Sequence, residues 1–214
     1  MDAPAELARG HARERVARLL RGGAEGNARL TAVTAIVLLV LLAAEGATIP
    51  FVHQQLTLHM ALGLALIPPV LLKLGTTGWR FFRYYLRDPQ YVRRGPPHPI
   101  LRLLVAPLTV ASTVVLFGTG VAIVAMHPQR GLVVGLHKAS FIVWFGAMAV
   151  HVLGHVLELP GHARVDRERE LPGARIRAFL LAAALVAGAV VAIAALPSIH
   201  QWVAWAAQHH RFDH

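Results

Sequence analysis

Histidine is the residue type that could carry chemistry in this chain of 214 residues, which contains 13 histidines and no cysteine. Four of them stand inside long apolar stretches, where an ionisable side chain is costly and marks a functional site by default: His59, His137, His151 and His155. The lack of cysteine excludes disulfides, iron–sulfur clusters, zinc–thiolate sites and a cysteine nucleophile in this chain. A metal or cofactor bound here must therefore depend on imidazole.

The apolar stretches that contain these histidines predict a membrane protein. Hydrophobic residues make up 56% of the chain and charged residues only 15%, whereas a soluble domain has about 25% charged residues. Five stretches can cross a hydrocarbon core of about 30 Å as helices, because lipid does not tolerate an open strand edge. These predicted spans are Leu30–Thr48, Leu56–Leu74, Leu103–Ala125, Leu132–Leu157 and Ala178–Leu196. The fold class is therefore an all-α integral membrane helix bundle of five transmembrane helices, with a kink at Pro68 and Pro69.

The predicted spans divide the chain into three parts. Residues 1–29 form a basic N-terminal segment, residues 30–197 the five-span membrane domain, and residues 198–214 a tail outside the membrane. The tail contains Trp202 and Trp205, which we expect at the membrane interface, as is typical of tryptophans just beyond a span.

Basic residues predict the orientation of this bundle. Of the 21 lysines and arginines, six precede the first span, seven lie in the connection that begins at Lys73, and five lie in the last connection. Only Arg130, Lys138 and Arg211 remain for the other side. The positive-inside rule therefore predicts a multi-pass membrane protein with its N-terminus inside and its C-terminus outside. The positive charge indicates anionic lipid as its partner rather than nucleic acid.

The spacing of the histidines predicts a pair at one depth. His137 and His151 are 14 residues apart, which is nearly four helical turns over about 21 Å, so they face the same way near opposite membrane surfaces. The second and fourth spans run in the same direction, which places His59 and His137 together near the outer surface. Two imidazoles on facing helices match the two axial positions of a haem iron. Three glycines would let a flat macrocycle approach the backbone: Gly63, Gly118 and Gly120.

Two stretches resemble a known family, the bacterial cytochrome b superfamily, which includes membrane subunits of formate dehydrogenase and nickel–iron hydrogenase. They are His59–Tyr85 (HMALGLALIPPVLLKLGTTGWRFFRYY) and Leu136–Leu157 (LHKASFIVWFGAMAVHVLGHVL). The resemblance implies a four-helix core plus one further helix, with His59 and His137 as axial ligands of an outer haem b and His151 as one ligand of an inner haem. It also implies a location in a bacterial-type cytoplasmic membrane and electron transfer between a quinone and a partner oxidoreductase subunit.

The chain departs from the family pattern in its inner half. The position 14 residues after His59 is Lys73, and the first span has no histidine. His151 and His155 lie on one helix and cannot bind an iron from opposite faces, so we expect one haem b, while two remain an alternative. His151, His155, Lys73 and Lys138 are therefore secondary candidates for cofactor contact, Lys73 through a haem propionate. Lys73, Lys138 and Glu45 lie near helix ends and could instead extend to the membrane interface.

Two other functions stay open. The chain could be a non-catalytic membrane anchor for a partner subunit, or a transporter in which histidines relay protons or bind a cation. Intramembrane carboxylates are nearly absent, which disfavours the transporter. Whether the chain is part of an enzyme, whether it forms a homo-oligomer, and whether it binds quinone directly are left open by these residues.

Overall fold

Helices account for the described structure, in which no strand occurs. The computed structural model describes residues 22–93, 101–126, 131–156 and 173–209. Its elements are α2 (Gly23–Thr48), η1 (Ile49–Phe51), α3 (Leu56–Ala65), α4 (Ile67–Tyr85), α5 (Pro89–Val92), η2 (Leu101–Val105), α6 (Ala106–Ala125), α7 (Leu132–Val156) and α9 (Ala174–His209). Five helical segments are long and apolar enough to cross a membrane, with α3 and α4 together forming the second. The predicted all-α membrane bundle is confirmed.

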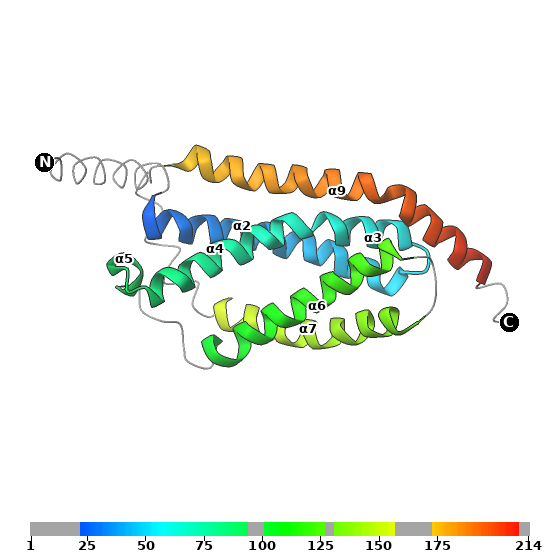
Figure 1. Cartoon of the computed structure of the whole chain (residues 1–214), viewed down its shortest axis with the longest axis horizontal. Helices are drawn as coiled ribbons and strands as arrows, with labels where there is room; N and C mark the ends of the chain where they lie inside the picture. Colours follow the sequence, from blue (N-terminus) through cyan, green and yellow to red (C-terminus); the bar gives the residue numbers. More distant parts are fainter. Residues whose placement is uncertain (1–21, 94–100, 127–130, 157–172, 210–214) are drawn as a thin grey trace, which may run out of the picture.

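The long helices lie side by side along one axis, and the chain runs back and forth between the two ends of the bundle (Figure 1). The start of α2, the end of α4 and α5 lie at one end. The end of α2, α3 and the start of α7 lie at the other. We call these the α5 end and the α3 end. Five apolar segments of bilayer length, joined by shorter connections, are sufficient to produce this back-and-forth arrangement.

The second span breaks where two prolines follow each other. Helix α3 ends at Ala65 and α4 begins at Ile67, with Leu66 between them. Pro68 and Pro69 have no N–H, so they cannot bond to the carbonyls four residues earlier, which belong to Leu64 and Ala65. The predicted kink is therefore present, as a break between two helices.

Helix α9 packs against both halves of this broken span. At Gly188 the two backbones approach so closely that a β-carbon would overlap the carbonyl oxygen of Ala65. That oxygen belongs to one of the carbonyls that the prolines deprive of a helical partner. A glycine at this point therefore lets α9 seat directly against the break, and a small residue here is a requirement of packing.

Polar contacts between helices fix the rest of the bundle. Asn27 on α2 donates to the Thr76 carbonyl on α4 at 3.0 Å. The Trp144 indole on α7 donates to the Thr113 hydroxyl on α6, also at 3.0 Å. Each contact ties a pair of neighbouring helices at a defined register, which apolar packing in lipid does not supply alone.

The ends of two spans differ from the sequence prediction. Helix α2 begins at Gly23 rather than Leu30, and α9 runs through Pro197 to His209 rather than ending at Leu196. The first part of the predicted tail is thus a continuation of α9. Trp202 is buried rather than interfacial, and its indole donates to the Ile123 carbonyl of α6 at 2.6 Å. Residues 1–21 and 210–214 of the predicted terminal segments lie outside the described residues.

Helix α4 ends in a motif that is normally completed by glycine. The Arg87 N–H bonds to the Tyr84 carbonyl, and the Asp88 N–H bonds to the Arg83 carbonyl, which is the hydrogen-bond pattern of a Schellman cap. Arg87 takes the left-handed position, with φ of 58°. A residue with a β-carbon costs about 1–2 kcal/mol in this conformation, so the arginine is held there at the expense of stability.

Candidate functional site

His59 is held by the end of the neighbouring helix α2. Its Nδ1 lies 3.0 Å from Glu45 Oε1 and 2.8 Å from the Thr48 hydroxyl. The Thr48 hydroxyl donates its own hydrogen to the Glu45 backbone carbonyl at 2.6 Å, so toward His59 it acts as an acceptor. A carboxylate also only accepts. Nδ1 therefore carries the hydrogen of the neutral ring, and Nε2 carries the lone pair.

His137 is held in the same way by α6. Its Nδ1 lies 3.0 Å from the Thr119 hydroxyl and 3.2 Å from the Leu116 carbonyl oxygen. Thr119 donates its hydrogen to backbone carbonyls of its own helix, at 2.7 Å and 2.9 Å. Both neighbours of Nδ1 are acceptors, so Nδ1 of His137 is again the donor and Nε2 again has the lone pair.

Both imidazoles lie at the α3 end of the bundle. His59 is on α3, and His137 hydrogen-bonds to α6, the helix against which α3 packs. Helix α3 packs against α9, α2 and α6, whereas α7 packs chiefly against α6. His59 and His137 therefore extend from two helices that both pack against α6. A position at the same end of the bundle is what the equal depth predicted from the sequence requires.

Two glycines press against this pair. A β-carbon at Gly120 would lie 3.4 Å from the His137 ring carbon Cε1, and one at Gly63 would lie 3.4 Å from Glu45 Oε1. Gly118 has nothing within 4 Å of such a position. Gly120 therefore leaves room for the His137 ring, and Gly63 leaves room for the Glu45 carboxylate. The sequence analysis did not assign this role to either glycine.

The secondary candidates lie apart from this pair. Lys73 is on α4, beyond the helix break, and its ammonium donates to the Thr31 carbonyl of α2 at 2.9 Å. Lys138 is exposed. His151 is half-buried farther along α7, and its Nδ1 is buried. His155 is within α7, but its side chain lies outside the described part of the structure. Of the predicted site residues, only His59 and His137 are brought together with their supporting groups.

Glu45, Thr48 and Thr119 are the supporting groups that the sequence analysis did not assign. Glu45 was expected to extend to the membrane interface, but it is largely buried and its carboxylate faces His59. A sequence signal existed, because Glu45 and His59 lie near facing ends of successive spans joined by a short connection. The choice between the interface and the histidine depends on the rotation of α2, which spacing does not reveal.

The ligand set at this site consists of two imidazoles. Within the described ranges, no group of three or more His, Asp or Glu side chains is arranged to hold a metal ion. A zinc ion takes three or four protein ligands, whereas a haem iron, already held by four porphyrin nitrogens, takes one or two. Two imidazoles whose Nδ1 atoms are bonded to acceptors could hold a haem iron through Nε2.

The resemblance to the bacterial cytochrome b superfamily depends on the two stretches quoted above, because broader comparison adds no relative. No protein-family model, curated protein or solved structure matches the chain.

Proposed function

We propose that this chain is a b-type cytochrome of a bacterial-type cytoplasmic membrane, and that His59 and His137 are the axial ligands of one haem b. The observation that carries the proposal is the pair of Nδ1 hydrogen bonds. A histidine that ligates a metal almost always donates its other ring hydrogen to a carboxylate, a carbonyl or a similar acceptor, which fixes the tautomer and raises the basicity of the ligand. Both histidines have such partners.

The bound group would supply one-electron redox chemistry, and the chain supplies its setting. His59 and His137 would hold the iron from two sides. Glu45, Thr48, Thr119 and the Leu116 carbonyl orient the imidazoles and keep Nε2 available. The surrounding apolar helices exclude water. With the N-terminus inside, the site lies in the outer half of the membrane, so we propose electron exchange with a quinone or with a partner oxidoreductase subunit on that side.

The test is haem binding by the purified full-length chain. We expect a low-spin b-type spectrum and about one haem per chain. His59→Ala and His137→Ala should each abolish haem retention or weaken it severely. His200→Ala is the matched control, because His200 is an exposed histidine on α9 outside the pair. His151→Ala should retain the full haem content.

Three results would contradict this proposal. A chain that stays colourless when haem is supplied would overturn the function. Normal spectra and full haem content in both single-alanine variants would overturn the ligand assignment. A ratio near two haems per chain, with one lost in His151→Ala, would overturn the single-haem stoichiometry.

The Glu45–His59 pair also favours a second function, proton relay in a transporter. A carboxylate and an imidazole 3.0 Å apart inside a span can exchange a proton. A colourless protein whose vesicles conduct protons, with conduction lost in Glu45→Gln, would favour this function over the cytochrome. A colourless protein without proton conduction would leave the anchor subunit.

A further inference from the structure

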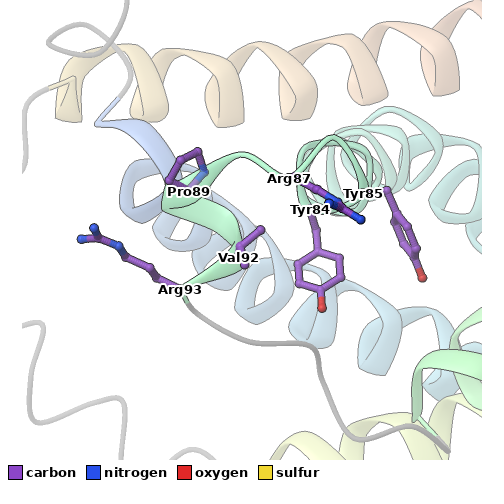
Figure 2. Close-up of a pocket in the computed structure, with 6 residues that line it drawn as sticks. All are labelled: Tyr84, Tyr85, Arg87, Pro89, Val92 and Arg93. Atoms are coloured by element: carbon purple, nitrogen blue, oxygen red, sulfur yellow. The ribbon is translucent and has the colours of Figure 1, made fainter.

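An open cavity lies at the α5 end of the bundle, far from the histidine pair. It has a volume of about 490 Å³ and is bordered by the last turn of α4, the connection after it and α5. Its lining consists of Tyr84, Tyr85, Arg87, Pro89, Val92 and Arg93. Figure 2 shows the guanidinium of Arg87 between the two tyrosine side chains, with Val92 facing Tyr84 from α5 and Arg93 extending outward at the rim.

The lining of this cavity is positively charged. Arg83, the neighbouring arginine on α4, forms an ion pair with Asp88 and lies over the Trp79 ring, 5.6 Å from its centroid. Arg87 and Arg93 are exposed and form no ion pair within the described part of the chain. The Arg87 guanidinium, which is suited to bidentate binding of a phosphate, therefore lines the cavity, while Arg93 extends outward from its rim.

From the length of the second span we expect the cavity at the depth of the lipid headgroups. Leu56–Tyr85 comprises 30 residues, which extend at most about 45 Å because the helix breaks at Leu66, and a bilayer with its headgroup regions is roughly 40–45 Å thick. Trp79, Phe82 and Tyr85 are exposed over the last turns of α4. Exposed aromatics of this kind are typical of the interface between the hydrocarbon core and the headgroups.

The backbone of Arg87 is a second, independent observation. Arg87 takes the left-handed position of the α4 cap, which glycine would occupy without strain. Residues in strained backbone conformations persist where the surrounding structure holds them, and they cluster at ligand-binding sites. In Figure 2 the Arg87 side chain lies beside those of Tyr84 and Tyr85, and all three line the same cavity.

We propose that this cavity binds the phosphate of an anionic glycerophospholipid. Arg87 is the principal phosphate ligand, Arg93 adds charge at the rim, and the hydroxyls of Tyr84 and Tyr85 are hydrogen-bond donors to the headgroup. The acyl chains lie along the exposed apolar and aromatic side chains of α4. This proposal does not depend on the haem, and it identifies a site for a specific lipid rather than a general attraction to the membrane surface.

The test compares Arg87→Gly with the wild-type full-length chain in detergent. Phosphatidylglycerol, phosphatidylcholine and inorganic phosphate are titrated separately, and bound lipid is counted by native mass spectrometry. We expect phosphatidylglycerol to bind at least fivefold more tightly than phosphatidylcholine, and Arg87→Gly to weaken it about fivefold, the factor that corresponds to about 1 kcal/mol for one arginine near a lipid surface. Arg175→Gln is the matched control, because Arg175 is an exposed arginine at the start of α9.

The Arg87→Gly variant also distinguishes the loss of the arginine that binds phosphate from a loss of folded structure. Glycine relieves the left-handed strain, so the lipid-free Tm of the variant should equal or exceed that of the wild type. The proposal is overturned if Arg87→Gly binds phosphatidylglycerol as tightly as the wild type, or if Arg175→Gln weakens binding equally. Equal binding of phosphatidylcholine, or equally tight binding of inorganic phosphate alone, would also overturn the assignment to an anionic lipid.

Discussion

The two central histidines differ in the acceptor that each uses. His59 donates to a carboxylate, whereas His137 donates to a backbone carbonyl and a hydroxyl. A carboxylate acceptor gives the imidazole more negative character than a neutral acceptor does. An imidazole ligand of more negative character stabilises the more positive oxidation state of an iron. The pair is therefore chemically asymmetric, although both residues are histidine.

This asymmetry predicts the effect of Glu45→Gln. The amide keeps a hydrogen-bond acceptor for His59 but removes the negative charge, so we expect the haem to be retained and its midpoint potential to rise. The expected shift is tens of millivolts, on the scale of about 59 mV for each tenfold change in a one-electron equilibrium. A redox titration followed by absorbance measures it.

Glu25→Gln is the control for this experiment. Glu25 lies in the first turn of the same helix, at the α5 end, so its loss should leave the potential unchanged. An unchanged potential in Glu45→Gln, with haem fully bound, would show that the carboxylate does not act on His59.

At the scale of the elements, the contact between α9 and the broken second span is the tightest constraint. Prolines remove the partners of two carbonyls, and the Gly188 backbone meets one of the residues concerned, Ala65. Lipid provides no hydrophobic force between helices, so a close fit of this kind supplies much of the association energy. The kink and the glycine are therefore one structural feature, although they are more than 100 residues apart in the chain.

Gly188→Ala should therefore destabilise the bundle. The added methyl group overlaps the Ala65 carbonyl oxygen, a backbone atom that cannot swing away, and overpacking of this kind costs about 1–3 kcal/mol. We expect a lower Tm in detergent. Gly146→Ala is the matched control, because a β-carbon at Gly146 on α7 meets nothing within 4 Å and alanine favours a helix. A Gly188→Ala variant as stable as Gly146→Ala would contradict the close contact.

At the scale of the whole molecule, positive charge distinguishes the two ends. The described arginines of α4, of the connection after it and of the start of α9 lie at the α5 end (Figure 1). The histidine pair lies at the α3 end. If the α5 end faces the cytoplasm, the proposed lipid site lies in the inner leaflet and the proposed haem in the outer half.

The positive-inside rule makes this orientation testable. Reporter fusions after His98 and after His214 should report opposite sides of the membrane, with His98 inside. Alkaline phosphatase activity for one fusion and fluorescence of green fluorescent protein for the other give independent readouts. The same side for both fusions would contradict the five-span topology, and a reversal of both would contradict the orientation.

The sequence alone predicted the five spans and the placement of His59 and His137 at the same end of the bundle. Both follow from local quantities, because a bilayer sets the length of an apolar run and a helix sets the rise per residue. The kink at Pro68 and Pro69 was predictable for the same reason, since a proline loses its hydrogen bond in any surroundings. The ends of α2 and α9 were not predictable in this way. Polar and small residues at a helix end are compatible with a continued helix when neighbouring helices pack against them.

Only the tertiary structure decided which groups meet across helices. Glu45 could reach either the interface or His59, and the rotation of α2 against α3 selects the histidine. Trp202 could lie in the interface or in the bundle, and its contact with the Ile123 carbonyl selects the bundle. A side chain's direction around a helix depends on contacts with residues distant in the chain, whereas the helix itself depends on residues within a few turns. The sequence therefore determined the membrane bundle and its histidines, and packing determined which acceptors bind Nδ1 of His59 and Nδ1 of His137.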